Sequence, residues 1–328
     1  MPRALTLGEL LVDFVATTED VPLEEAPGFL RAPGGAPANV AAGLAKLGVP
    51  AGFIGKVGDD PFGRFLRRVM AEVGVDISRT LVAPGRRTAL AFIANWSNGK
   101  KDICFYRHPG ADQLLEPDEM DEDYLAAADV FHFGSVSLSH APARQATIHA
   151  AHLARKAGAL ISYDPNLRLG LWDSPDEARE WIWYVMDRAH VVKLAEEEWE
   201  FITGTDSLSQ GSRDLLDQGA LLVIATRGAL GCYFNNGTAE GYVEGFRANT
   251  IEPLGAGDAF VAAVLAQLLA SEEHPLTALE AADEARLRGI MRYANAAGAL
   301  TTEKMGVIPA LPTAEQVEAA LRERWAAK

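Results

Sequence analysis

The sequence predicts an α/β fold in which helices cover both faces of a mainly parallel sheet. The first observation behind this prediction is that short apolar runs alternate with helical segments along most of the 328 residues. The second is that these runs read as strands buried on both faces, as parallel strands are. The third is that no linker rich in Pro, Gly or Ser divides the chain, so we treat residues 1–328 as one domain.

The expected elements follow one another in the order that such a sheet requires. Strands at Ala4–Leu7 and Ala51–Val57 enclose a helix of small residues at Asn39–Leu47. The alternation continues through strands at Val130–Phe133, Leu160–Tyr163, Val191–Leu194 and Leu221–Thr226, and through helices at Ala143–Lys156 and Glu177–Met186. After residue 255 the chain is mostly helical, with helices expected at Ala278–Arg292 and Ala314–Trp325.

One region breaks this rhythm and predicts a separate small sheet. Strand candidates at Thr88–Trp96 and Asp102–Arg107 flank Ser97-Asn98-Gly99-Lys100, and Asn-Gly between such runs is a strong hairpin signal because both residues tolerate positive φ. Leu10–Val15 is a candidate to pair with this hairpin. We therefore expect a β-sheet lid formed by residues 9–35 and 86–110.

Composition excludes several classes of protein. A formal charge of −15 and a pI near 4.9 argue against a surface for nucleic acid or anionic membrane. The two cysteines form no CxxC and offer neither a disulfide framework nor a thiolate metal site. Glu9 and Asp13 interrupt the apolar stretch near the N-terminus, and no apolar run reaches membrane-spanning length. We expect a soluble cytoplasmic protein.

The most informative motif is Leu254-Gly255-Ala256-Gly257-Asp258-Ala259-Phe260, which an apolar helical run follows. Two glycines before a helix let backbone N–H groups converge at a point where the helix dipole also favours negative charge. A carboxylate there can take a proton from a hydroxyl while the turn stabilises a transferring phosphoryl group. The motif alone is equally compatible with an ordinary loop that Asp258 caps.

A second glycine motif, Gly34-Gly35-Ala36-Pro37-Ala38-Asn39, precedes the small-residue helix. The glycines allow a ligand to approach the backbone closely, and the Asn39 amide offers both a donor and an acceptor, as a polyol requires. Asp13 interrupts an apolar strand, which is costly unless its carboxylate is exposed or bound. A capped turn and an exposed strand residue are the structural alternatives.

Polar residues also follow three of the expected strands, at the sheet edge where α/β proteins bind ligands. These segments are Asp164-Pro165-Asn166-Leu167-Arg168, Glu196-Glu197-Glu198 beside Lys193, and Thr226-Arg227-Gly228-Ala229-Leu230-Gly231. Arg168 can contact phosphate oxygens, and the acidic cluster can hold Mg²⁺ through water, although acidic residues are common at any helix N-terminus. The chain has neither a P-loop nor a GxGxxG motif after its first strand.

The order of these motifs resembles the ribokinase-like (PfkB) carbohydrate kinases over nearly the whole chain. The segment 34–39, with Gly43, Leu47 and Gly48, is similar to the family's N-terminal motif, and the segment 255–260 is similar to the core of its C-terminal motif. Features that resemble the fructokinase branch include Gly8-Glu9, Phe105-Tyr106-Arg107, Ala111-Asp112 and Leu171-Trp172. The resemblance implies a three-layer sandwich with a mainly parallel central sheet and a small β-sheet lid.

The resemblance also implies residue roles. Asp258 would be the general base that deprotonates a primary hydroxyl of the sugar, and the N–H groups of Gly255, Ala256 and Gly257 would form an anion hole, with Arg168 near the phosphates. The other implied roles are sugar binding by Asp13, Gly34, Gly35, Asn39 and Arg107, an ATP site with Lys193, Thr226, Gly228, Gly231 and Asn295, and a water-mediated Mg²⁺ contact by Glu198. The lid would close over the sugar and exclude water.

Two segments depart from the family pattern. Glu252-Pro253-Leu254 stands where the family usually has Asp-Thr-Thr, and that Asp often helps to hold K⁺ near the anion hole. The change puts activation by K⁺ in doubt. Ala195 stands where many members have Asn in an Asn-x-x-Glu motif, so Mg²⁺ would depend on Glu198 and water. Neither change removes Asp258 or the backbone donors.

We therefore expect an ATP-dependent fructokinase that makes fructose 6-phosphate and uses Mg²⁺. Kinases of 2-keto-3-deoxygluconate and of aminoimidazole riboside or other nucleosides share much of the motif set and are alternatives. A catalytically silent sugar- or nucleotide-binding protein is an alternative of another class, which Ala195 and the turn 252–254 suggest. The presence of Asp258 argues against it.

The strand pattern of the lid also predicts that the protein forms an oligomer. Strand alternation places alternate residues on opposite faces, Leu90, Phe92, Ala94 and Trp96 on one and Ala89, Ala91 and Ile93 on the other. One face can cover the sugar, but the second would stay exposed on a monomer. We expect a homodimer joined through the lid by an isologous contact. The alternative is a monomer whose lid packs on its own domain.

Overall fold

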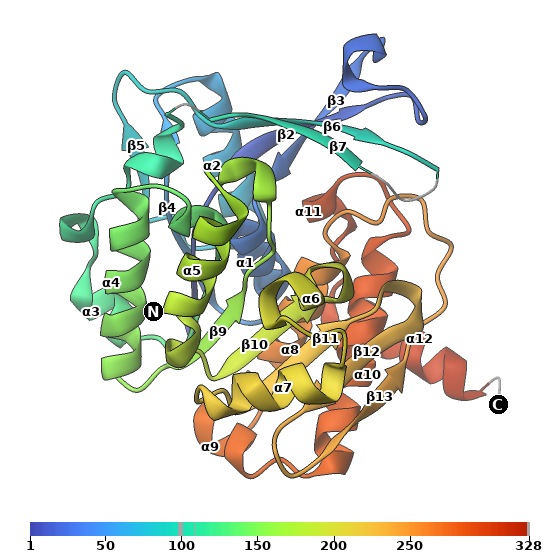
Figure 1. The fold of residues 1–328 in the computed structure, drawn as a ribbon. Coiled ribbons are helices and arrows are strands. Elements are labelled where there is room, and N and C mark those ends of the chain that lie inside the picture. The colour runs from blue at the N-terminus through green and yellow to red at the C-terminus, as the bar shows by residue number, and fades with distance from the viewer. Residues whose placement is uncertain (98–100, 108, 327–328) are drawn as a thin grey trace.

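The computed structural model describes residues 1–97, 101–107 and 109–326 and shows a sheet between two layers of helices (Figure 1). The nine strands of this sheet are, in spatial order, β13 (Glu240–Glu244), β12 (Gly231–Asn235), β11 (Leu222–Thr226), β10 (Val191–Ala195), β9 (Leu160–Asp164), β8 (Val130–Gly134), β1 (Ala4–Leu7), β4 (Ala51–Gly58) and β5 (Thr80–Ala83). Strands from β5 to β11 pair in parallel, and β12 and β13 extend the sheet as an antiparallel edge. The predicted α/β class is confirmed.

Helices cover both faces of this sheet. One layer consists of α3 (Glu122–Ala126), α4 (Ala143–Lys156), α5 (Pro175–Tyr184), α6 (Glu196–Thr203) and α7 (Leu208–Asp217). The other consists of α1 (Ala36–Lys46), α2 (Pro61–Val73), α8 (Ala256–Leu269), α9 (Pro275–Glu280), α10 (Glu284–Thr301), α11 (Val307–Ala310) and α12 (Ala314–Ala326). Short 3-10 helices lie at Leu23–Glu25, Ala111–Leu114, Pro117–Glu119, Val136–Leu138, Leu169–Leu171, Met186–Arg188 and Gly228–Leu230.

Alternation along the strands divides the core in two. In β10, for example, Val191 packs with the layer of α8 and α10, whereas Val192 packs with the layer of α4 and α5. Both side chains are buried. The continuous apolar character of the strands therefore follows from having a helical layer on each face.

One expected helix is wrong in its extent. The segment Ala278–Arg292 contains parts of two helices, α9 and α10, rather than one. The carboxylate of Asp283 accepts a hydrogen bond from the N–H of Arg286 at 2.8 Å and so caps the start of α10. Asp283 is a signal for the start of a helix in the sequence. We expected one continuous helix because helix-forming residues stand on both sides of it.

The lid is a second sheet of four strands, in the order β3 (Phe29–Gly34), β2 (Leu11–Ala16), β6 (Leu90–Asn95) and β7 (Lys101–Tyr106). The expected pairing of the N-terminal strand with the hairpin is confirmed, because β2 runs parallel to β6 and β6 antiparallel to β7. Residues 98–100 of the expected Asn-Gly turn lie outside the described residues. In Figure 1 the lid projects over one edge of the central sheet.

Close packing of α1 against α8 fixes the two glycine motifs relative to each other. A Cβ atom on Gly43 of α1 would lie 2.7 Å from the Cβ of Ala262 in α8. Residues four apart share a helix face, so the same contact line carries Asn39 and Asp258. No helix within the described ranges is long and apolar enough to cross a bilayer.

Candidate active site

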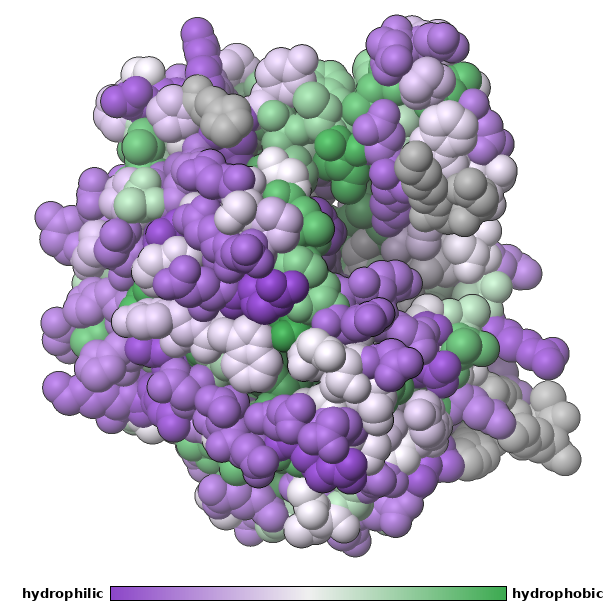
Figure 2. Space-filling view, viewed as in Figure 1, coloured by the Kyte–Doolittle hydropathy of each residue, from purple (hydrophilic) through white to green (hydrophobic). Residues whose placement is uncertain are grey.

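A cavity of about 1530 Å³ lies between the lid and the carboxyl ends of the central strands. Figure 2 shows the molecule hollowed beneath the lid. Segments that follow β9, β10 and β11 line the cavity, namely residues 166–169, the start of α6 and the turn after Thr226. A site for one small molecule typically has about 300–1000 Å³, so this cavity has room for two ligands side by side.

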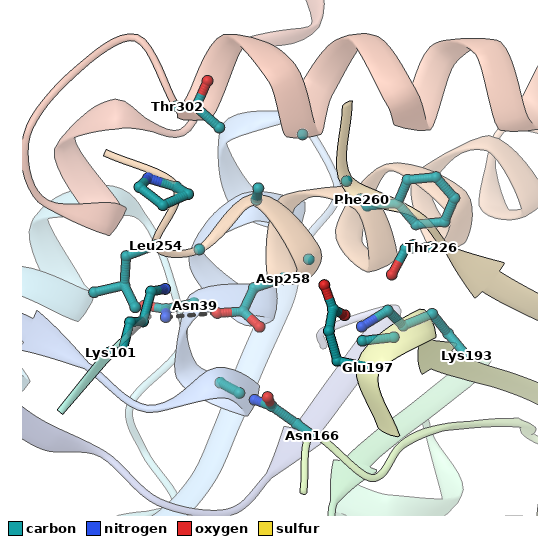
Figure 3. Close-up of a pocket in the computed structure, with 18 of the residues that line it drawn as sticks. Asn39, Lys101, Asn166, Lys193, Glu197, Thr226, Leu254, Asp258, Phe260 and Thr302 are labelled. Atoms are coloured by element: carbon teal, nitrogen blue, oxygen red, sulfur yellow. Dashed lines mark hydrogen bonds between the residues drawn. The ribbon is translucent and has the colours of Figure 1, made fainter. Parts of the chain in front are cut away.

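The turn before α8 forms part of the cavity wall (Figure 3). Gly255 has a φ of +80°, and a Cβ atom there would lie 2.2 Å from Val307 Cγ1, so only glycine fits. The first N–H groups of a helix have no partner within the helix. In α8 these groups belong to residues that line the cavity, where the helix dipole favours an anion.

Asp258 lies in the first turn of α8 and is only 9% exposed. Its Oδ2 atom accepts a hydrogen bond from Asn39 Nδ2 at 2.7 Å (Figure 3). Burial raises the pKa of Asp258 to about 6, and the hydrogen bond from Asn39 limits the rise. A carboxyl group with such a pKa is ionised at neutral pH and can accept a proton.

Asp13 enters the cavity from β2 of the lid and is also buried. Burial raises its pKa to about 7, and the carboxylates of Asp258 and Glu252 add to the rise. Gly34 does not line the cavity. A Cβ atom on Gly34 would lie 2.1 Å from Asp13 Oδ2, so this glycine makes room for the Asp13 carboxylate, whereas Gly35 faces the cavity as expected.

Arg107 is placed differently from the expectation of a direct sugar contact. Its guanidinium is buried, and Nε donates to Asp112 Oδ2 at 2.6 Å. The other nitrogens donate to Ser139 Oγ at 3.2 Å and to the carbonyl of Val136 at 3.3 Å. Arg107 is outside the cavity lining. Sequence spacing could not show this, because Ser139 and Val136 lie 32 and 29 residues away in the sequence.

Lys193 of β10 and Asp164 of β9 form a buried ion pair of 2.9 Å, and Lys193 lines the cavity. Burial alone would lower the pKa of Lys193, but the carboxylates of Asp164 and Glu198 raise it. The ammonium therefore stays charged. A Cβ atom on Gly257 would lie 3.3 Å from Lys193 Nζ, which places this charge directly beside the turn of α8.

Both carboxylate oxygens of Glu198 accept hydrogen bonds from backbone N–H groups. Oε1 accepts from the N–H of Ala195 at 2.8 Å and Oε2 from the N–H of Leu167 at 2.7 Å. It thereby anchors the loop that carries Arg168, whose side chain lines the cavity and donates to the carbonyl of Leu167 at 3.0 Å. Among the residues described, no group of three or more His, Cys, Asp or Glu is arranged to hold a metal ion.

The remaining expected nucleotide residues all line the cavity, at Thr226, Gly228, Gly231 and Asn295. Gly231 has a φ of +100°, and a Cβ atom there would lie 2.1 Å from the carbonyl oxygen of Val243. Asn295 Nδ2 donates to the carbonyls of Val243 and Glu244 at 3.3 and 3.1 Å. These contacts join α10 to β13 at the wall of the cavity.

Five charged residues of the cavity are absent from the site predicted from the sequence, namely Glu9, Lys101, Glu197, Arg247 and Glu303. Lys101 comes from β7 of the lid, Glu197 from the start of α6, and Glu9 from the segment before β2. Figure 3 shows the side chains of Lys101 and Glu197 reaching into the cavity from opposite sides. Strand alternation with Ile103 and Phe105 could have placed Lys101 on the inner face; nothing in the run of three glutamates distinguished Glu197.

The unusual turn at Glu252 is buried rather than exposed. Its Oε2 atom accepts a hydrogen bond from the N–H of Gly306 at 2.8 Å, and Oε1 is buried without a partner among the described residues. Pro253 and Leu254 line the cavity. The segment 252–254 lies immediately before the turn that begins α8.

Comparisons with known proteins show the family of this chain. The pfkB family of carbohydrate kinases matches residues 1–314. A protein named probable fructokinase-4 from Arabidopsis thaliana is 44% identical over 319 residues, which cover 97% of this chain and 96% of that protein.

Solved structures are similar over the same length. A fructokinase from Xylella fastidiosa with bound ATP has a TM-score of 0.90 and 31% identity and covers 99% of this chain and 100% of that one. A fructokinase from Vibrio cholerae O395 with fructose, ADP and calcium ion has a TM-score of 0.86 and 31% identity, covering 98% and 99%. The fold predicted from the resemblance is therefore confirmed.

Proposed function

Because the chain belongs to the pfkB family of carbohydrate kinases, we propose that it transfers the γ-phosphoryl group of ATP to a primary hydroxyl of fructose to give fructose 6-phosphate. The observation that carries the proposal is the Asp258 carboxylate, which is held by Asn39 at the N-terminus of α8 and faces a cavity for two ligands. The similarity to fructokinases over nearly the whole chain supports fructose as the acceptor.

In the proposed reaction Asp258 accepts the proton of the sugar hydroxyl as the hydroxyl oxygen attacks the γ-phosphorus, and the bond from the γ-phosphorus to the bridging oxygen breaks to release ADP. The hydrogen bond from Asn39 orients the carboxylate. The N–H groups of Gly255, Ala256 and Gly257 stabilise the charge on the transferring phosphoryl group. Lys193, beside Gly257, and Arg168 add positive charge at the same place.

The sugar would lie under the lid, with Asp13, Gly35 and Asn39 as its polar contacts. Asp13 and Asn39 approach from the lid and the main body, respectively. We assign Gly34 and Arg107 supporting roles. Gly34 leaves room for Asp13, and Arg107 ties the base of β7 to Asp112. A sugar held between the two layers is shielded from water, which limits hydrolysis of ATP.

ATP would occupy the part of the cavity lined by Thr226, Gly228, Gly231 and Asn295. Mg²⁺ bound to the phosphates of ATP would neutralise part of their charge. Among the described residues, no group of three or more His, Cys, Asp or Glu is arranged to hold the ion without the phosphates. Glu198 would contact the hydrated ion only through water, since both of its oxygens already accept backbone hydrogen bonds. The turn at Glu252 raises the separate question of a monovalent cation. Comparing turnover in K⁺ and in Na⁺ tests whether such a cation binds at this turn and activates the enzyme.

A panel of sugars with ATP and Mg²⁺ tests the proposed substrate. We expect turnover of fructose above that of 2-keto-3-deoxygluconate, ribose and aminoimidazole riboside, with fructose 6-phosphate identified by a coupled isomerase assay. Turnover of one of the other compounds without fructose would assign the chain to another branch of the family. Sugar binding by calorimetry without phosphorylation in any cation would identify a silent binding protein.

We also propose that the protein is a cytoplasmic homodimer joined through the outer face of the lid. Phe92 on this face stacks on Phe14 at 5.0 Å and meets Phe29 and Tyr106 edge-on. Helix α2 covers part of this outer face, where the ring of Phe62 contacts that of Phe14. Tyr106 is 64% exposed, so an apolar area remains for a second copy to cover.

Cell fractionation tests the proposed cytoplasmic location of the protein.

A further inference from the structure

Lys101 is a cation of the cavity that the mechanism above does not use. It is the first residue of β7 and shares a face of the lid with Asp13, Ile103 and Phe105, all of which line the cavity. Pairing with Asn95 of β6 fixes its backbone. In Figure 3 its side chain points from the strand into the cavity on the side of Asn39 and Asp258.

The surroundings of Lys101 are crowded with carboxylates. Asp258 and Glu252 belong to the main body, Asp13 belongs to the lid, and all three are buried and interact electrostatically with the ammonium. Asp13 and Asp258 repel each other, because each ionised carboxylate disfavours ionisation of the other. The lid therefore places a like charge against the group that has to be ionised to accept a proton.

We propose that Lys101 is the counter-charge by which the lid keeps Asp258 ionised. The inference rests on the proposed kinase activity. Lys193 and Arg168 supply positive charge from the nucleotide side, whereas Lys101 supplies it from the sugar side, on the same sheet as Asp13. Lys101 acts through Asp258 and is thus a positioning residue. The lid would accordingly complete the electrostatics of the base as well as cover the sugar.

Other charged residues also face Asp258 and Lys101, and a test has to leave them unchanged. Asp258 faces Asp13, Asp164, Lys193 and Arg168. Lys101 faces Arg168 and Glu252 in addition to the two aspartates. Burial and Arg168 lower the pKa of Lys101, and the three carboxylates oppose this. Replacement of Lys101 alone leaves all of the other groups in place.

The experiment compares the pH dependence of kcat/KM for the wild type, Lys101→Gln and Lys101→Arg between pH 5 and 9. Loss of the positive charge raises the pKa of Asp258, so the acid limb of the Gln variant should move up by roughly half to one pH unit. Its kcat/KM should be about two- to fivefold low near pH 6 and approach that of the wild type above pH 8. Arg should keep the wild-type limb.

Arg31→Gln is the matched control. Arg31 lies on the opposite face of the lid, 3.9 Å from the ring of Phe65, so its loss removes one positive charge from the lid without changing the cavity. Its acid limb should stay in place. A Lys101→Gln profile lowered by the same factor at every pH, or an equal shift in Arg31→Gln, would overturn the proposal.

A direct titration of the Asp258 carboxyl group tests the role of Lys101 independently of the proposed kinase activity. In protein labelled with ¹³C at the aspartate carboxyl carbons, the Asp258 signal is assigned by its absence from Asp258→Asn, and its pKa is read without turnover. We expect a higher pKa in Lys101→Gln than in the wild type. An unchanged pKa refutes the role of Lys101 whichever sugar is phosphorylated, whereas failure to phosphorylate fructose refutes only the substrate.

Discussion

At the scale of single residues, Asp258 is subject to two opposing influences. Burial and the nearby carboxylate of Asp164 raise its pKa, while the hydrogen bond from Asn39 and the charges of Lys193 and Arg168 lower it. The result, a pKa of about 6, leaves the group ionised at neutral pH and still basic enough to take a proton in the transition state. Small changes around this carboxylate should therefore alter the rate.

Replacing the carboxylate tests its role as the base. Asp258→Asn keeps the size of the side chain but removes the proton acceptor. We expect kcat to fall by about 10²–10⁴-fold while the dissociation constant for fructose, measured by calorimetry, changes by less than about tenfold. Near wild-type turnover in this variant would remove Asp258 from the mechanism.

The pH profile of the wild type tests the ionisation state. Burial sets the pKa of Asp258 to about 6 and that of Asp13 to about 7. Because the base acts in its ionised form, kcat/KM should be constant above this range and fall about tenfold per pH unit below pH 6. The residual rate of Asp258→Asn should lose this dependence; an identical limb in that variant would assign it to another group.

Asp13 should reduce stability in the unliganded protein. Its pKa is raised in the folded state, so the folded state binds the proton more tightly and stability from this group falls as pH rises from about 4 to 7. Asp13→Asn should therefore increase the free energy of unfolding at pH 8 by roughly 1–3 kcal/mol, and by less at pH 5. Urea denaturation at both pH values measures the difference, and a loss of stability at pH 8 would contradict it.

At the scale of elements, the contact between α1 and α8 determines whether Asn39 reaches Asp258. A Cβ on Gly43 would lie 2.7 Å from the Cβ of Ala262, so Gly43→Ala should push the helices apart. We expect a loss of about 1–3 kcal/mol in stability and a fall in kcat, as the 2.7 Å hydrogen bond lengthens. Coupled assays and urea denaturation measure both.

The compensating change provides the control for this prediction. Ala262→Gly removes the atom that the new methyl group would meet. In the double variant Gly43→Ala/Ala262→Gly the helices can approach again, so turnover should recover more than stability, because glycine in a helix interior itself costs about 1 kcal/mol. Equal turnover of the single and double variants would show that helix spacing does not limit the reaction.

Most elements could be predicted from the sequence, because their signals are local. Apolar runs gave the strands, and α4 matches its expected range residue for residue. The error at Ala278–Arg292 arose where a capping aspartate stands among helix-forming residues. Helices α2 and α7 and strands β5, β12 and β13 were not predicted. Arg107 could be placed at the end of a lid strand, but its hydrogen bonds to Ser139 and Val136 could not be predicted, because they depend on how the lid packs on the domain.

At the scale of the whole molecule, the site could be predicted because parallel strands bring their carboxyl ends to one edge. Asp164 and Lys193 therefore meet, whereas Asn39 and Asp258 meet because α1 packs against α8. The directions of individual side chains could not be predicted in this way. Glu197 and Glu198 are adjacent in sequence, yet Glu198 turns to backbone amides while Glu197 faces the cavity (Figure 3).

The exposed outer face of the lid makes assembly the last property to test. Tyr106 is 64% exposed beside Phe92 on this face, and an isologous contact would bury it twice. Light scattering at micromolar concentration should give twice the 35.2 kDa chain mass for the wild type. Tyr106→Asp should give the chain mass, because a buried unpaired charge opposes association. Tyr184→Asp, at a tyrosine 51% exposed on α5, should leave the dimer intact. A wild-type mass of one chain, unchanged by fructose, would rule the dimer out.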